Sequence, residues 1–232
     1  MHTCPYYHTV VRLSGLQEFC TPRARSDSMY SINTDSRFRG GTAVLPLKNL
    51  LDAKVTGLSS YYLKPNMGDP TVDIPLINMG DIADGTINAK TVKMVTVRKT
   101  GKLESDTILP GDVILTLRAQ PFRAVIAGED VAGAALSANL VGLRCSDRIK
   151  PEILAAWFNS SAGQRVLAPR AGISTLVGIS LKELLQVEVP VPSYEQQDLL
   201  SRYLALTTEH TRILKEEQKL LDSIVDSMMN SL

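Results

Sequence analysis

The sequence contains no uninterrupted apolar stretch long enough to cross a membrane, which takes about 20 residues. The most apolar stretch, residues 124–143, is interrupted by Glu129, Asp130 and Asn139. The first residues of the chain, Met1–Tyr7, also lack the basic and then apolar regions of a secretory signal. We therefore expect neither a membrane protein nor a secreted one.

Cysteines are few, and neither sign of charge dominates. Cys4, Cys20 and Cys145 cannot form a complete set of disulfides, which indicates a reducing, cytoplasmic compartment. The 25 basic and 24 acidic residues give a formal net charge of +1, which excludes a strongly basic tail. Hydrophobic residues make up 44% of the 232 residues, enough for a core that needs no metal or disulfide.

Sequence motifs of common enzyme sites are also missing. The chain has no complete phosphate-binding P-loop, no G-x-S-x-G motif and no G-x-G after a predicted strand. The three histidines lie near the two ends of the chain. These absences favour a binding protein without catalytic residues. A nuclease that uses Asp81, Asp84 or Asp112 stays open as an alternative.

Residues 1–44 differ from the rest of the chain. They are rich in arginine, serine and threonine, have no sustained apolar period and end close to Gly40-Gly41. We predict an extension of uncertain structure with a short strand at Thr9–Leu13. Its potential zinc ligands match no paired-ligand spacing, so we assign no metal site. These ligands are His2, Cys4, His8 and Cys20.

Residues 45–192 are dense with short strand patterns and turns. Asp84-Gly85 predicts a hairpin. Pro151 suits the first turn of a helix that continues to Pro169, and Ser180–Glu183 is a capping box that begins another short helix. The predicted strands are Asp73–Ile77, Thr91–Val97, Val113–Leu117, Arg123–Ile126, Asn139–Arg144 and Val187–Val191.

A second capping box, Ser193–Gln196, begins a helical pattern that runs to Leu232. Apolar residues recur in it every seven residues, which is typical of coiled coils. A helix of this length would extend roughly 60 Å, more than the width of one domain of this size. We therefore predict that residues 193–232 form a spacer and dimerisation helix, while packing back on its own domain stays open. The expected interface residues are Leu200, Tyr203, Leu214, Leu221, Ile224 and Met228.

Six segments occur in an order and spacing that is found in one family. They are Ile74–Ile82 with Gly85, Leu109–Leu115, Leu136–Asn139, Phe158–Gln164, Gly172 before Ile179-Ser180, and Val189–Gln196. Together they resemble the specificity subunit of type I restriction-modification systems over about residues 45–232. The resemblance implies an α+β fold, in which a mixed-sheet target-recognition domain (45–192) precedes a long coiled-coil-type helix (193–232).

Specificity subunits have two such domains, so this chain resembles a half-size form with a single target-recognition domain. The resemblance implies a non-catalytic subunit that reads one half of a split sequence in double-stranded DNA. A homodimer would then demand an inverted-repeat target. Adenine methylation with S-adenosylmethionine would belong to a methyltransferase subunit, which docks on the helical region in the family, and a restriction subunit could join the complex. The alternative is a coiled-coil adaptor whose β-rich domain binds a protein or other ligand.

Candidate DNA contacts combine basic groups, which suit phosphates, with amides and guanidiniums, which can read base edges. Arg118, Gln120 and Arg123 follow a predicted buried strand, and we expect this loop to read sequence. Lys90 and Lys93, beside the hairpin, are expected to position the backbone. The remaining candidates are Tyr61 and Lys64, and, in the Gly172 loop, Arg170, Ser174 and Thr175.

Overall fold

The computed structural model divides the chain into two units, residues 1–41 and residues 42–232. It describes residues 7–11, 19–22, 42–83, 85–100, 103, 106–118, 120–170 and 178–231. In the first unit, β1 (Tyr7–Val11) and β2 (Phe19–Pro22) form an antiparallel pair, and β1 overlaps the predicted strand at Thr9–Leu13. The side chains of the potential zinc ligands in this unit lie outside the described part of the chain.

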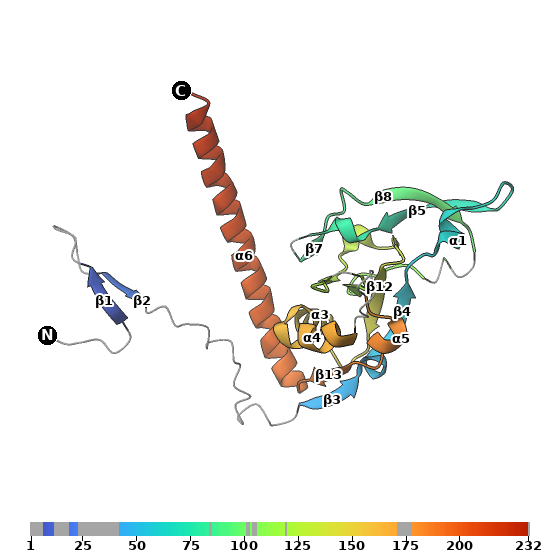
Figure 1. Cartoon of the computed structure of the whole chain (residues 1–232), viewed down its shortest axis with the longest axis horizontal. Helices are drawn as coiled ribbons and strands as arrows, with labels where there is room; N and C mark the ends of the chain where they lie inside the picture. Colours follow the sequence, from blue (N-terminus) through green and yellow to red (C-terminus); the bar gives the residue numbers. More distant parts are fainter. Residues whose placement is uncertain are drawn as a thin grey trace. The chain divides into compact units, whose positions relative to one another are not determined.

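The second unit is built on an antiparallel four-stranded sheet in the order β10-β9-β12-β4, of which Figure 1 labels β12 and β4. Side chains of β9 alternate between two buried clusters: Val113 and Leu115 face one, and Ile114 faces the other. Both faces of this sheet are therefore covered, which explains the continuous apolar run of β9. The bounds are β4 (Leu51–Thr56), β9 (Val113–Thr116), β10 (Ala124–Ile126) and β12 (Leu140–Cys145).

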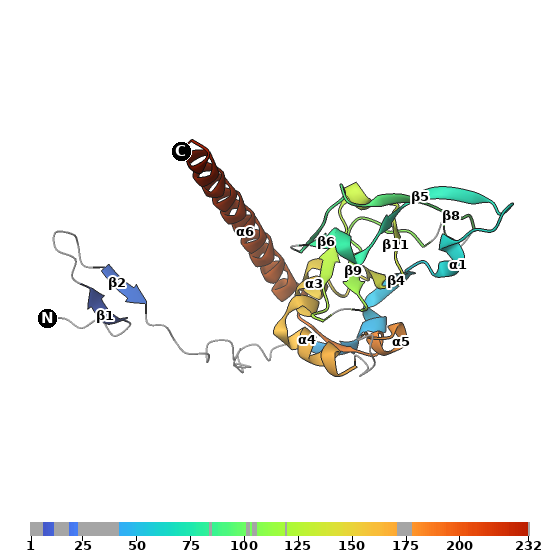
Figure 2. The same ribbon diagram turned by 45° about the horizontal axis from the view of Figure 1, so that its top comes forward.

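Smaller sheets surround this one (Figure 2). β5 (Thr71–Ile77) pairs antiparallel with β8 (Lys93–Arg98) and parallel with β11 (Ala135–Leu136), so the fold contains a mixed sheet, as predicted. β6 (Ile82–Ala83) and β7 (Thr86–Ile87) form the predicted hairpin.

The second unit begins earlier than residue 45. β3 (Ala43–Pro46) pairs antiparallel with β13 (Glu188–Val191), and Ala43 lies opposite Val191. Ala43 and Val44 therefore pair within this unit, although the predicted extension includes them. The strand they form was not predicted, because its pairing partner lies about 145 residues away in the sequence.

The helix predicted from Pro151 to Pro169 is in fact two helices, α3 (Pro151–Asn159) and α4 (Ser161–Leu167). Between them, Ser160 has extended backbone angles, and its hydroxyl accepts a hydrogen bond from the Gly163 N–H (3.1 Å), which caps α4. The continuous apolar pattern did not reveal this break. α3 packs against β9 and β10.

The remaining short helices are single turns. α5 (Leu181–Leu184) starts at the capping box predicted at Ser180. The others are α1 (Ser60–Leu63) and the 3₁₀ helices η2 (Leu47–Leu50), η3 (Met79–Asp81), η4 (Glu129–Val131) and η5 (Ala168–Arg170).

The chain ends in α6 (Tyr194–Met229), a helix of 36 residues whose capping box, Ser193 with Gln196, is confirmed. From residue 205 to 231 every residue is exposed except the half-buried Thr207. From residue 205 onward, the helix therefore does not pack back along the described part of the chain. None of the helices that the structure describes combines the length and the apolarity of a membrane span.

The first turns of α6 are fixed to the second unit by a buried amide. Gln197 is 3% exposed; its side chain accepts a hydrogen bond from the Lys150 N–H (2.8 Å) and donates to the carbonyls of Arg148 and Pro192 (3.0 Å each). The Lys150 ammonium also pairs with Asp198. These contacts set the direction in which α6 leaves the domain.

Cys145, the last residue of β12, is a half-buried thiol without a disulfide. Burial raises the pKa of this thiol to about 12, with a further contribution from Asp112 and other carboxylates. Since only the thiolate reacts, we expect iodoacetamide at pH 8 to modify Cys145 much more slowly in the native than in the urea-unfolded protein, as followed by peptide mass spectrometry. Equal rates would contradict the burial.

The same pKa predicts a pH dependence of stability. Above about pH 9, the Cys145 thiol loses its proton in the unfolded state before it does so in the folded state. The unfolded state then binds fewer protons, so the contribution of Cys145 to stability is intact below this pH and is lost as the pH rises toward 12.

Candidate nucleic-acid interface

The loop between β9 and β10 carries Arg118, Gln120 and Arg123, all of them exposed. The base of the loop is closed by two hydrogen bonds: the Thr116 N–H donates to the Arg123 carbonyl (3.0 Å), and the Arg123 N–H donates to Thr116 Oγ1 (2.9 Å). Two guanidiniums and one amide are thus held on one short loop at the end of a buried strand. Their contact with DNA stays a prediction.

Backbone hydrogen bonds join residues 137–139 to this loop on one side and to β5 on the other. The Leu117 N–H donates to the Asn139 carbonyl (2.8 Å), and the Ser137 N–H donates to the Ile77 carbonyl (2.9 Å). Lys93 is exposed and lies opposite Leu76, the neighbour of Ile77. The β9–β10 loop and Lys93, two candidate contacts that the sequence suggested separately, are therefore separated by residues 137–139 and by β5.

Asn139 is a candidate contact that sequence reasoning did not select. Its side chain is exposed, and its carbonyl accepts a hydrogen bond from the Leu117 N–H next to the loop. An asparagine amide can pair with the N6 and N7 atoms of adenine. The Leu136–Asn139 motif includes this asparagine, so the sequence could have pointed to it. Only the pairing of β9 with β12 shows that Asn139 adjoins the loop.

Tyr61 and Lys64 are both exposed, but Tyr61 already has a cationic partner. The Arg98 guanidinium lies 4.0 Å from the centre of the Tyr61 ring and forms an ion pair with Asp69 (2.8 Å). Arg98 and Lys93 occupy opposite ends of β8, roughly 17 Å apart along the strand. The structure therefore does not bring Tyr61 together with Lys93 at one point of the surface.

Arg170 is exposed and donates a hydrogen bond to the Val166 carbonyl (2.6 Å). With Ser180 and Lys182 it lines an open hollow of about 570 Å³. Glu183 also lines the hollow; hydrogen bonds from Ser180 lower the pKa of its carboxyl group, and the charge of Arg170 lowers it further. Two other predicted contacts of this region, Ser174 and Thr175, lie outside the described residues.

After that region, Gly178 and Ile179 lie directly beside the start of the β9–β10 loop. The Ile179 N–H donates to the Leu117 carbonyl (2.9 Å). A Cβ on Gly178 would lie 2.8 Å from the same carbonyl oxygen and 3.0 Å from Cγ of Arg118. Glycine is therefore the residue that allows this close approach.

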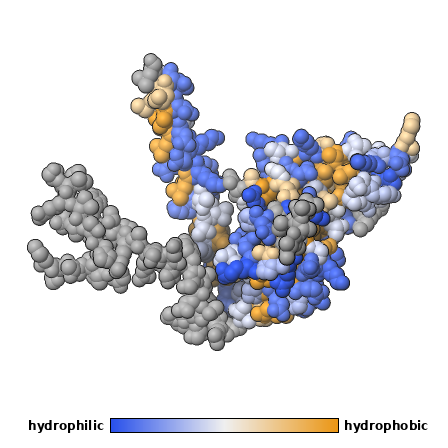
Figure 3. Space-filling view, in the orientation of Figure 1, coloured by the Kyte–Doolittle hydropathy of each residue, from blue (hydrophilic) through white to orange (hydrophobic). Residues whose placement is uncertain are grey.

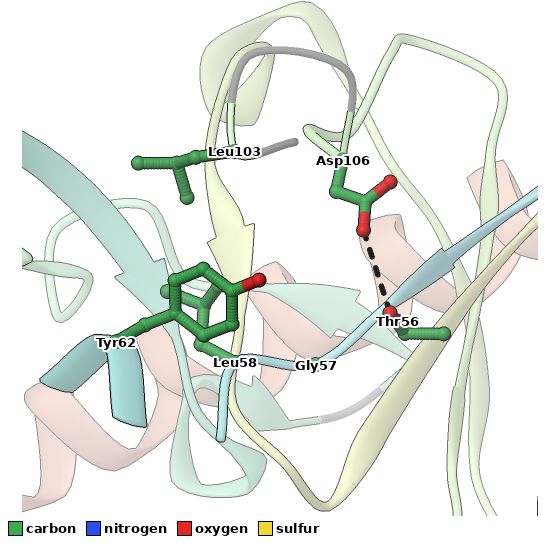
Figure 4. A pocket seen from close by; sticks show the side chains of 6 residues that line it. All are labelled: Thr56, Gly57, Leu58, Tyr62, Leu103 and Asp106. Carbon is green, nitrogen blue, oxygen red and sulfur yellow. Dashed lines mark hydrogen bonds between the residues drawn. The ribbon is translucent and has the colours of Figure 1, made fainter. Parts of the chain in front are cut away.

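A small cavity lies between Thr56, Tyr62 and Leu103 (Figure 4). Its volume of about 20 Å³ has room for one water molecule. Thr56 Oγ1 and Asp106 Oδ2 are joined across its rim at 3.5 Å. The cavity is too small for a nucleotide or another organic ligand.

The carboxylates of the nuclease alternative have structural partners. Asp81 accepts hydrogen bonds from the Asn78 N–H (2.7 Å) and from Thr91 Oγ1 (2.6 Å), which close a turn. Asp112 is buried in an ion pair with Arg144. Asp84 lies outside the described residues. Among the residues that the structure describes, no three His, Cys, Asp or Glu side chains are grouped to hold a metal ion.

Hydrophobic side chains are exposed along α6 (Figure 3). The six residues predicted to form the dimer interface are between 41% and 65% exposed in the single chain. They are Leu200, Tyr203, Leu214, Leu221, Ile224 and Met228. Contiguous exposed apolar surface of this kind typically marks an interaction site.

No known family profile and no curated protein matches the sequence. Solved structures do match. One is a chain of the type I R-M system, solved to explain complex assembly and conformational transition (TM-score 0.58, 21% identity, 82% of this chain and 44% of that chain). Another is the HsdS subunit from Thermoanaerobacter tengcongensis (TM-score 0.54, 22% identity, 77% of this chain and 40% of that chain).

These matches confirm the predicted fold, a mixed-sheet α+β domain followed by a long helix, as that of type I R-M specificity subunits. The chain spans less than half the length of the solved chains that it matches.

Proposed function

We propose that this chain is a DNA-specificity subunit of a type I restriction-modification system and reads one half of a split target. The observation that carries the proposal is the fold shared with HsdS together with the closed loop that presents Arg118, Gln120 and Arg123. Guanidinium and amide groups can form bidentate hydrogen bonds with guanine and adenine in the major groove. The role is recognition, and the chain supplies no catalytic group.

The exposed apolar stripe of α6 supports a homodimer. Two copies joined through residues 193–232 would restore two readers at a fixed separation, because Gln197 fixes the start of each helix to its domain. The two half-sites would be identical and inverted, since they are related by the two-fold axis of the protein.

Catalysis in this proposal belongs to partner subunits in the cytoplasm. A methyltransferase subunit that binds S-adenosylmethionine would dock on the helical region, and a restriction subunit could join it. The chain itself would need no cofactor. Co-purification of a tagged chain with a methyltransferase subunit tests this part; a protein or glycan partner without any DNA affinity would instead support the adaptor alternative.

Replacing Arg118 or Arg123 with alanine is expected to cost about 1–3 kcal/mol of binding free energy on the preferred site and to relax specificity at one base position. Lys93→Ala should weaken binding to all sequences alike. It should also lower the slope of log affinity against log salt concentration by about one, the effect of one lost phosphate contact. The measurement is a binding selection on randomised duplexes with a salt titration for each variant.

Arg165→Ala, a change at an exposed arginine of α4, is the matched control and should leave both affinity and motif unchanged. If the variants at Arg118 and Arg123 keep the parent motif and lose affinity uniformly, the loop only clamps phosphates. If the parent protein shows no salt-dependent DNA binding at all, the proposed function is wrong.

A further inference from the structure

β10 forms an edge of the four-stranded sheet, and only β9 pairs with it. In the extended segment that leads into β10, alternate residues direct their N–H and C=O groups away from β9. The N–H and carbonyl of Arg123 both form hydrogen bonds with Thr116 of β9. The N–H and carbonyl groups of its neighbours Phe122 and Ala124 therefore point away from β9. An unpaired edge of this kind would leave the end of the readout loop free to shift.

Two side-chain amides close this edge in place of a strand. Asn159 accepts a hydrogen bond from the Ala124 N–H (2.9 Å) and donates one to the Ala124 carbonyl (2.8 Å). Gln164 does the same at Phe122: it accepts from the N–H (3.0 Å) and donates to the carbonyl (2.9 Å). Each amide therefore supplies one donor and one acceptor to one residue, as the backbone of a neighbouring strand would.

The break between α3 and α4 brings these two amides to the same edge. Gln164 Nε2 also donates to the Phe158 carbonyl (2.6 Å), which ties the first turn of α4 back to the end of α3. A Cβ on Gly163 would lie 2.1 Å from the Trp157 carbonyl oxygen, so only glycine permits the two helices to meet this closely. The Phe158–Gln164 segment is thus shaped to present the amides of Asn159 and Gln164.

The opposite end of the loop is fixed as well. Leu117 donates its N–H to Asn139 and accepts a hydrogen bond from Ile179 at its carbonyl. With Leu117 held at one end and residues 122–124 at the other, only four residues of the sequence separate the two fixed points. The directions of Arg118 and Arg123 then depend on these anchors.

We propose that Asn159 and Gln164 are positioning residues for DNA readout: their amides hold the Arg118–Arg123 loop in the geometry that discriminates between bases. The inference rests on the proposed function, and it assigns a specificity role to two side chains of the helical layer that point to the sheet edge. Base discrimination requires a guanidinium fork to meet two acceptors at once, whereas phosphate binding tolerates displacement.

The test compares Gln164→Met with Gln197→Met. Both changes remove a side-chain amide that makes three hydrogen bonds, but Gln197 anchors α6 and does not touch the loop. Hydrogen–deuterium exchange resolved to single amides is the first readout. We expect the Phe122 amide to exchange at least about tenfold faster in Gln164→Met, and the Lys150 amide to respond in this way only in Gln197→Met.

The second readout is a selection on randomised duplexes at a concentration where each variant is folded. Gln164→Met should lose about tenfold of its preference for the best half-site while binding random duplexes as tightly as the parent. Gln197→Met should keep the base preference within each half-site, because its amide does not contact the loop; any change should affect only the spacing between half-sites. If Gln164→Met does not fold, Asn159→Ala removes the other amide at this edge instead. The exchange rate of the Ala124 amide is then the readout.

Unchanged exchange at Phe122 or Ala124 overturns the inference, because the amides then do not hold the edge. Faster exchange with unchanged base preference also overturns it, because the loop then reads DNA without them. A parent protein that binds no DNA refutes the proposed function instead, and the exchange result still reports separately whether the amides fix the loop.

Discussion

Replacing Asp112 with alanine is expected to lower the free energy of unfolding by about 3 kcal/mol. The Asp112 side chain is 2% exposed and accepts hydrogen bonds from Arg144 Nε (2.9 Å), from Arg144 Nη2 (2.8 Å) and from the Leu109 N–H (2.9 Å). Alanine would leave the guanidinium without its counter-ion and the turn at Leu109 without its acceptor. The Arg144 side chain is 29% exposed and can recover some hydration, so the loss falls at the lower end for a broken buried pair.

Urea unfolding followed by circular dichroism measures this loss. Asp147→Ala, which removes an exposed carboxylate, is the control and should change stability by less than about 0.5 kcal/mol. A double-mutant cycle with Arg144→Met isolates the coupling between the two partners. The hydrogen bond to Asp112 raises the pKa of Arg144. A loss below about 1 kcal/mol for Asp112→Ala would show that the pair is worth no more than a surface salt bridge.

Local signals in the sequence located much of the fold. The capping boxes at Ser180 and Ser193 begin α5 and α6 where they were predicted, because a cap is satisfied within four consecutive residues. The apolar run at Val113–Leu117 and the turn at Asp84-Gly85 likewise mark a buried strand and a hairpin. These features depend on neighbours in the chain and need no knowledge of the tertiary structure.

Features that depend on distant residues were missed. The pattern from Pro151 to Pro169 is helical throughout, and the break at Ser160 became visible only where Gly163 approaches Trp157. Asn159 would ordinarily be read as a polar residue at the end of a surface helix. Its bond to Ala124 joins residues 35 positions apart, which no periodicity records.

The candidate interface also combines features that neighbouring residues determine with features that distant residues determine. Arg118, Gln120 and Arg123 lie on one loop, as their closeness in sequence predicts, while their contact with DNA stays a prediction. The sequence did not show that Tyr61 has a cationic partner, because Arg98, which lies over its ring, is 37 positions later in the chain. Asn139 was not selected as a candidate because its proximity to the β9–β10 loop arises from strand pairing alone.

Replacing both Leu214 and Leu221 with aspartate is expected to convert the protein from a dimer to a monomer. The two leucines are 50% and 52% exposed in the single chain and lie one heptad apart on α6. In a dimer with two-fold symmetry, the double change would bury four unpaired carboxylates, and each of them costs several kcal/mol. Sedimentation equilibrium should then report the mass of one chain, 25.3 kDa, where the parent gives twice that mass.

Ser223→Asp is the matched control for the helix variants. Ser223 is exposed and lies two residues after Leu221, about 200° around the helix axis, so its aspartate would face solvent in the dimer. It should leave the mass unchanged, and circular dichroism should show α6 intact in all variants. On an inverted-repeat duplex, the monomeric variant should lose the cooperative binding of two half-sites while each domain keeps its base preference, since avidity is lost without any change in the loop. A dimer that survives both leucine substitutions would place the contact between copies elsewhere and leave the stripe of α6 for a different subunit.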